Sequence, residues 1–175
     1  MDASALDRAI RDLAHDIAEA HPGETPYALL GILRRGRPIA DRLAACIESE
    51  TGTRPPVGSL ATTLYRDDVR SGKAKPIVPG GETHFDFDVD GTSIVLVDDV
   101  INSGRTIRAA MDEVIDYGRP ARIQLACIID RGLRELPIQA DYLARQIDTQ
   151  PGDHVSVQIR EIDGEDVVLI RRSTT

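Results

Sequence analysis

The sequence predicts an α/β protein whose central, mostly parallel sheet is flanked by helices. Two patterns predict it. Short apolar runs, typical of strands covered on both faces, alternate with longer stretches in which apolar residues recur every three or four positions, as on one face of a helix. Such alternation builds βαβ units, which make neighbouring strands parallel. The length of 175 residues suits one domain, residues 1–175, with a largely aliphatic core because aromatic residues make up only 3% of the chain.

The first half of the chain predicts a helix, a strand, a second helix and a second strand. The first helix has Ser4 as its N-cap. Its apolar face consists of Leu6, Ile10, Leu13 and Ile17. A strand over residues 27–33 leads through a loop over 34–38 into the second helix, and the second strand covers 57–65. Residues 66–91 hold glycine and proline without an apolar period, which indicates a long mobile loop or a protruding hairpin.

The second half predicts a strand over residues 93–99 and a helix over 105–117 that is stopped by a glycine and a proline. A buried strand over 122–130 and a short strand over 140–147 follow. Residues 155–170 alternate in polarity on either side of the turn sequence DGED, which is typical of a β-hairpin.

Composition limits the kinds of function. The formal net charge of −8 argues against a nucleic-acid footprint over the whole surface, although a local basic face remains open. The only lysines are Lys73 and Lys75; an arginine-rich chain suits a phosphate ligand, and a GC-rich genome would produce the same bias. Cys46 and Cys127 lie in apolar patterns, as in a reduced cytosolic protein. The N-terminus does not resemble a signal peptide, so we expect a cytoplasmic protein.

Two loops lie at the carboxyl ends of predicted strands, where open parallel sheets bind ligands. One spans residues 33–36. The other begins with the adjacent Asp98 and Asp99 and continues to a helix N-terminus, where backbone N–H groups and hydroxyls form a phosphate cradle. The alternative is that Ser103 only caps the helix and the aspartates only cap the strand. A phosphoacceptor receiver domain also has such an acidic pair, but it needs a later lysine, and none follows here.

The stretch IVLVDDVINSGRT, residues 94–106, resembles the phosphoribosyl-pyrophosphate (PRPP) signature of type I phosphoribosyltransferases. More narrowly, the chain is similar to the bifunctional pyrimidine operon regulators and uracil phosphoribosyltransferases. Three further stretches carry this resemblance: GILRRG at 31–36, TLYRDD at 63–68, and the run from Gly118 to Tyr142. The resemblance implies the type I phosphoribosyltransferase fold, with a long mobile loop and a C-terminal β-hairpin.

The resemblance also implies roles for these residues. Carboxylates accept hydrogen bonds from a vicinal diol, so Asp98 and Asp99 would hold the ribose 2′ and 3′ hydroxyls and stabilise the positive charge that grows on the ribose. The pyrophosphate site would comprise Arg34, Arg35 and Gly36, and the catalytic set would be Asp98, Asp99, Arg66 and Arg35. The 5′-phosphate would be held by Asn102, Ser103, Gly104, Arg105 and Thr106.

The base site implied by the resemblance lies between residues 129 and 138. Its residues would be Ile129, Asp130, Arg131 and Ile138. Since uracil is uncharged, backbone groups can read it, and the alternative is that Arg131, Arg134 and Glu135 form a structural ion-pair turn.

Regulatory members of this family bind a messenger-RNA leader through basic residues near the base site. Here Leu133 and Gln139 replace a histidine and an arginine, which removes phosphate contacts and leaves Arg134 and Arg145 as the candidates for RNA binding. We therefore expect a Mg²⁺-dependent uracil phosphoribosyltransferase that binds uracil, PRPP and UMP. The alternative is a UMP-responsive regulator that binds pyrimidine-operon leader RNA. Mg²⁺ would be bound through PRPP, and the resemblance implies a homodimer or a higher homo-oligomer.

Overall fold

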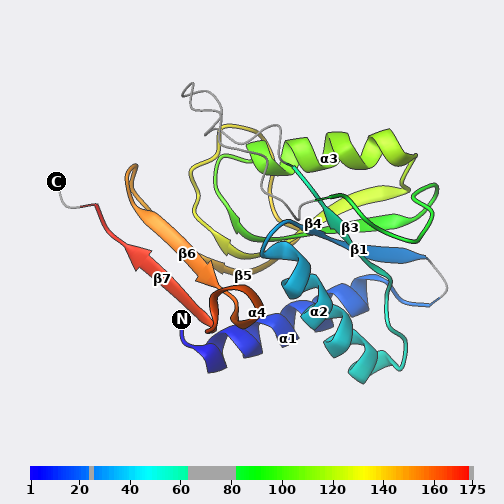
Figure 1. The fold of residues 1–175 in the computed structure, drawn as a ribbon, viewed down its shortest axis with the longest axis horizontal. Coiled ribbons are helices and arrows are strands. Elements are labelled where there is room, and N and C mark those ends of the chain that lie inside the picture. Colours follow the sequence, from blue (N-terminus) through cyan, green and yellow to red (C-terminus); the bar gives the residue numbers. More distant parts are fainter. Residues whose placement is uncertain (24–25, 63–81, 174–175) are drawn as a thin grey trace.

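A five-stranded sheet forms the centre of the protein in a computed structural model that describes residues 1–23, 26–62 and 82–173 (Figure 1). The strands lie in the order β2-β1-β3-β4-β5, and all four pairings are parallel. Their bounds are β1 Tyr27–Ile32, β2 Val57–Leu60, β3 Ser93–Ile101, β4 Arg122–Asp130 and β5 Tyr142–Gln146. The prediction of a parallel α/β sheet is confirmed.

Helices cover both faces of this sheet. α1 (Ala3–Ala20) and α2 (Gly36–Thr51) lie on one face, and α3 (Arg105–Tyr117) lies on the other (Figure 1). Side chains on the first face form one buried cluster with α1 and α2, and those on the second form another with α3. The apolar face predicted for α1 is fully buried. Removing apolar surface from water stabilises a fold by about 25 cal/mol per Å², so this burial is the main source of the protein's stability.

The N-cap of α1 is Asp2 and not Ser4, so that prediction is wrong. The Asp2 backbone is extended, and its carboxylate accepts a hydrogen bond from the Ala5 N–H at 2.8 Å. Asp and Ser are equally good caps, and the two residues are only two positions apart. The sequence pattern alone therefore did not distinguish them.

The C-terminal hairpin pairs β6 (His154–Gln158) with β7 (Val167–Arg171) in antiparallel fashion, as predicted. A short helix, α4 (Arg160–Asp163), lies between them and was not predicted. The first residue of the chain joins the hairpin, because the Met1 ammonium donates to Val168 O and Val168 N–H donates to Met1 O. The inner side of the hairpin packs against the same cluster as α1 and α2.

The predicted loop over residues 66–91 is described only from Glu82 onward. His84 bridges antiparallel to Ser59 of β2, with N···O distances of 2.8 and 2.9 Å. The strand predicted over 57–65 stops at Leu60, and residues 63–81, which include Arg66, lie outside the described part. Within the described ranges, no helix has the length and apolar character to cross a membrane.

Candidate functional site

The aspartate pair lies where the sheet topology changes direction. β1 and β3 are neighbours in the sheet. The connection from β1 leads through α2 to β2 on one side, and the connection from β3 leads through α3 to β4 on the other side, so the two connections diverge between β1 and β3. Ligands bind at such points in open α/β sheets. The pairing of β3 with β1 ends at Val97, but its pairing with β4 continues to Ile101. Asp98 and Asp99 therefore lie inside β3 and not at its end as predicted, because β4 extends the strand.

Two glycines allow the loop after β1 to fold tightly against β3. A Cβ on Gly36 would overlap the backbone carbonyl oxygen of Val97, and a Cβ on Gly31 would overlap the backbone of Arg37. The Leu33–Arg34 peptide bond within this loop is cis. The close approach brings Arg34 and Arg35 next to the aspartate pair, so the structure gives Gly36 a packing role beside Val97.

A cavity of 380 Å³ unites the residues of these two loops. It is lined by Leu33, Arg34, Arg35, Asp98, Asp99, Ile162 and Asp163. The predicted carboxylates Asp98 and Asp99 and two of the predicted arginines, Arg34 and Arg35, thus share one site. Ile162 and Asp163 come from α4, and the sequence patterns did not indicate them. No local pattern indicates their contribution, because Asp163 is 128 positions from the arginine that it contacts.

The two aspartates form the negative side of this cavity. Asp98 is 8% exposed, and its Oδ1 accepts the Asp99 backbone N–H at 2.9 Å, while Asp99 Oδ1 accepts the Val100 N–H at 2.9 Å. Burial raises the pKa of the Asp99 carboxyl, while hydrogen bonding with Asp98 and the charge of Arg35 act in the opposite direction. Adjacent carboxylates fixed in this way can accept hydrogen bonds from two neighbouring hydroxyls or oppose a growing positive charge.

Arg35 faces a third carboxylate across the cavity. Its Nε and Nη2 donate to Asp163 Oδ2 and Oδ1 at 2.9 and 2.8 Å, and this fork lowers the pKa of Asp163 to about 2. Hydrogen bonding to Asp163 also raises the pKa of Arg35. Arg34 is exposed, so its guanidinium has room to meet an anion that enters from solvent.

The loop predicted to hold a phosphate forms the N-terminus of α3. Gly104 is the N-cap, with φ +91°, a backbone conformation that favours glycine. The alternative that Ser103 is the helix cap is therefore wrong in position, although its Oγ accepts the Arg105 N–H at 3.4 Å. The Arg105 guanidinium pairs with Glu135 at 2.6 Å. Thr106 is half-buried in the first turn. Backbone N–H groups at this terminus favour an anion.

The predicted base-binding segment takes the form of an ion-pair turn. The Arg134 guanidinium donates to Asp130 Oδ2 and to the carbonyl oxygens of Asn102 and Ile138, at 2.6–2.7 Å. Arg131 donates to Asp153 O at 2.7 Å. Of the three residues in the structural alternative, Arg134 forms an ion pair within the turn, with Asp130, whereas Arg131 bonds to a backbone carbonyl and Glu135 pairs with Arg105. The segment does not line the aspartate cavity, whereas its contact with Asn102 O ties it to the phosphate loop.

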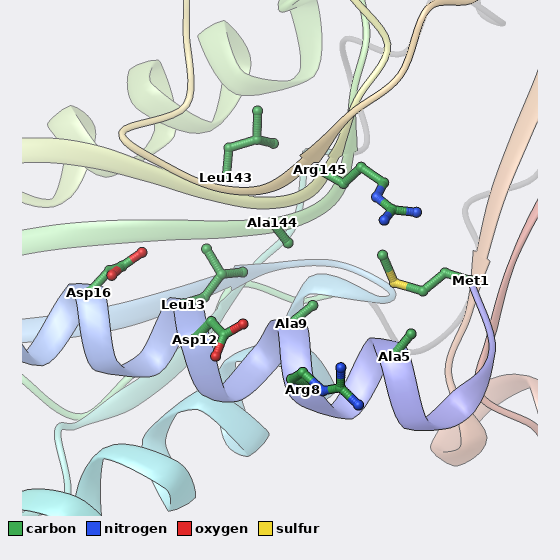
Figure 2. A pocket seen from close by; sticks show the side chains of 10 residues that line it. All are labelled: Met1, Ala5, Arg8, Ala9, Asp12, Leu13, Asp16, Leu143, Ala144 and Arg145. Atoms are coloured by element: carbon green, nitrogen blue, oxygen red, sulfur yellow. The ribbon is translucent and has the colours of Figure 1, made fainter.

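The two candidates for RNA binding lie in different surroundings. The side chain of Arg134 is only 18% exposed and fully engaged by the turn. Arg145 of β5 is exposed and borders a second cavity, of 240 Å³, between α1 and β5 (Figure 2). Arg8 of α1 lines the same cavity, but so do Asp12 and Asp16. Because acids and arginines alternate there, this cavity is not a basic patch.

Comparison with known proteins defines the class of protein first. A family model for the phosphoribosyl transferase domain matches residues 2–169. The hypoxanthine phosphoribosyltransferase of Trypanosoma cruzi superposes over 99% of this chain and 95% of its own, with a TM-score of 0.69 at 15% identity. That of Staphylococcus aureus covers 92% of this chain and 84% of its own, with a TM-score of 0.66 at 14% identity. Fold and family model together define a phosphoribosyltransferase.

Relatives with higher sequence identity narrow the assignment within the phosphoribosyltransferases. The bifunctional protein PyrR of Clostridioides difficile is 47% identical over 171 residues, which cover 98% of this chain and 96% of that protein. The PyrR of Thermus aquaticus is 48% identical over 168 residues, which cover 96% and 92%. The chain therefore belongs to the family of the bifunctional PyrR proteins, and the resemblance found in its motifs is confirmed.

Proposed function

We propose that this protein transfers the phosphoribosyl group of PRPP to uracil, forming UMP and pyrophosphate. One observation carries the proposal: the aspartate pair of β3 and the arginines of the loop after β1 line a single cavity at the point where the sheet changes direction. The loop at the N-terminus of α3 follows directly along the chain. The phosphate loop, the aspartate pair and the arginines thus match a ligand that carries a diol between a phosphate and a pyrophosphate.

Each group has a physical role in the proposed reaction. Asp98 and Asp99 accept hydrogen bonds from the ribose 2′ and 3′ hydroxyls. As the bond to pyrophosphate breaks, positive charge grows on the ribose, and fixed carboxylates stabilise it more strongly than they stabilise the neutral sugar. Arg34 and Arg35 receive the charge of the departing pyrophosphate. Because Gly36 packs against β3, the arginines stay aligned with the carboxylates.

The remaining contacts follow from the surrounding segments. The backbone and hydroxyls of residues 102–106 hold the 5′-phosphate, assisted by the dipole of α3. Uracil lies against residues 129–138, whose fold is fixed by Arg134. We propose that Arg66, which lies outside the described residues, completes the catalytic set.

Mg²⁺ fits the donors of this cavity. Carboxylate oxygens and phosphates are its preferred ligands, and Asp98 and Asp99 line the cavity; within the described residues no group of three acidic or histidine side chains is placed to hold the ion by itself, so most of its ligands would come from PRPP. We propose that Mg²⁺ would be held through the phosphates of PRPP and would supply charge neutralisation for the leaving pyrophosphate.

The experiment is a base panel. The protein is incubated with PRPP, Mg²⁺ and either uracil, orotate, hypoxanthine or guanine, and the nucleotide product is followed. We expect UMP from uracil and little product from the other bases. Turnover with orotate or a purine but not with uracil would refute the substrate assignment.

A second function is suggested by the relatives, whose name calls them bifunctional. We propose that the protein also regulates pyrimidine genes by binding a leader RNA in a UMP-dependent manner, though more weakly than members with more basic surfaces. Leu133 and Gln139 lack cationic groups, and Arg134 is engaged internally. A mobility shift with leader RNA, with and without UMP, tests this. Tight, salt-sensitive binding that UMP enhances would show that other surfaces supply the contacts.

We further propose a cytoplasmic homodimer or higher homo-oligomer, as the family resemblance implies. Sedimentation velocity over a range of protein concentrations tests the assembly, and a monomer throughout would contradict it.

A further inference from the structure

We infer that Asp163 is a positioning residue for the transfer reaction: its carboxylate holds the Arg35 guanidinium at the pyrophosphate side of the cavity and so keeps it from closing onto Asp99. The inference rests on the proposed function, and it deepens that proposal by assigning a role to a residue outside the motifs that the family resemblance supplies.

The geometry of the contact supports positioning. The fork to Asp163 uses Nε and Nη2 of Arg35, at 2.9 and 2.8 Å, and does not use Nη1. Arg35 can thus keep its orientation and still donate to an incoming anion. The carboxylate is itself fixed, because Asp163 Oδ2 also accepts the Ile159 N–H at 2.9 Å. Its side chain is 17% exposed, so little solvent competes for it.

The charges of the cavity explain why Arg35 needs a fixed partner. Three aspartates and two arginines line it, and Arg35 interacts electrostatically with both Asp163 and Asp99. Without Asp163, the nearest compensation for Arg35 would be the aspartate pair. An ion pair there would occupy the oxygens that accept the ribose hydroxyls and would draw the guanidinium away from the pyrophosphate. The bidentate fork is the stronger geometry, and it favours the open arrangement.

The helix that carries Asp163 is anchored on the helix that follows Arg35. Arg42 of α2 donates to both oxygens of Glu161, at 2.8 and 2.6 Å, and to Asp166 Oδ1 at 2.8 Å. Asp166 also accepts the Arg160 N–H at 2.9 Å. α4 is therefore attached to α2 through Arg42, and Arg35, which is the N-cap of α2, is joined to Asp163 of α4. Through these contacts the segment between β6 and β7 contributes Asp163 to the site.

Glu161 supplies a matched control. Like Asp163, it lies on α4 and pairs bidentately with an arginine of the same α2 region, but it is exposed and does not line the cavity. If the pair between Arg35 and Asp163 only held α4 in place, Glu161→Gln and Asp163→Asn would have similar effects.

The experiment compares wild type, D163N, E161Q, R35Q and the double variant R35Q/D163N. Steady-state kinetics with PRPP and uracil are combined with calorimetric titration of inorganic pyrophosphate, and urea unfolding verifies that each variant is folded. We expect D163N to lower kcat/KM for PRPP and the affinity for pyrophosphate about tenfold, with the KM for uracil unchanged. E161Q should stay within about twofold of wild type, because Arg42 keeps its contact with Asp166 and α4 stays attached to α2. In the R35Q background, D163N should have no further effect, because Asp163 acts through Arg35.

Equal effects of D163N and E161Q would overturn the inference, since the pair would then serve only to attach α4. A loss with D163N that persists in the R35Q background would also overturn it, because the carboxylate would then act on the ligand directly. If wild type makes no UMP, the proposed function fails. The pyrophosphate titrations then still decide whether Asp163 sets the anion affinity of Arg35.

Discussion

The substitution Gly36→Ala tests whether the close approach of the arginine loop to β3 matters. The added Cβ would overlap the Val97 carbonyl oxygen, which is a backbone atom and cannot rotate away. Relieving the overlap requires the loop to move by about 1 Å, and overpacking of this kind costs about 1–3 kcal/mol. Because Gly36 is the first residue of α2, alanine would otherwise stabilise the helix by up to about 1 kcal/mol. A lower free energy of unfolding in G36A would therefore show that the overlap occurs, whereas a higher one would show that it does not.

The same displacement should affect catalysis. A shift of about 1 Å in a positioning group can cost about 100-fold in rate. We expect kcat/KM for PRPP to fall by that order in G36A, as measured by UMP formation, with a parallel loss of unfolding free energy in urea. The control is G52A at the other end of α2. Gly52 has φ +78° and open space around its Cβ position, so alanine there costs about 1–2 kcal/mol of backbone strain without touching the site. Wild-type activity and stability in G36A would refute the reasoning.

Three further predictions concern stability. Since Arg35 lowers the pKa of Asp163 from 3.8 to about 2, the pair stabilises the fold above pH 4 and loses this contribution as the pH falls toward 2. The shift corresponds to about 2.4 kcal/mol, which solvent screening reduces to about 1 kcal/mol; urea unfolding of D163N against wild type should show this difference at pH 6 and only a small remainder near pH 2, and a constant difference would contradict it. D2A should cost about 1 kcal/mol and S4A less than about 0.5 kcal/mol, and equal losses would mean that Asp2 is not the cap. R42Q removes the arginine that ties both Glu161 and the largely buried Asp166 to α2, so we expect amide exchange to accelerate in α4 while α3 is unchanged; uniform acceleration would argue against local anchoring.

Local patterns predicted those elements whose ends are fixed by local chemistry. The bounds of α3 and β4 were predicted closely, because apolar periodicity and the Gly118–Pro120 stop act within the segment itself. The continuation of β3 past the aspartates was not predicted, since it depends on hydrogen bonds to β4. The strand propensity of a segment carries no information about a partner strand that is distant in sequence.

The residues of the candidate site were also predicted only in part. The motif resemblance identified the aspartate pair together with Arg34 and Arg35, and the structure brings these four residues into one cavity. It gave no indication of Asp163, whose segment was interpreted only as a turn. Contacts such as that of Asp163 with Arg35 depend on where the C-terminal hairpin docks, and side-chain periodicity carries no information about docking.

The central claim is that the Asp98–Asp99 pair stabilises the charge that develops on the ribose, and the most direct test is UMP formation by wild type, D98N and D99N. We expect wild type to form UMP from uracil and PRPP. Each variant should lose more than about tenfold in kcat/KM, which is at least ~1.4 kcal/mol of transition-state stabilisation, while remaining folded in urea titrations. A loss below about tenfold in both variants would contradict the claim.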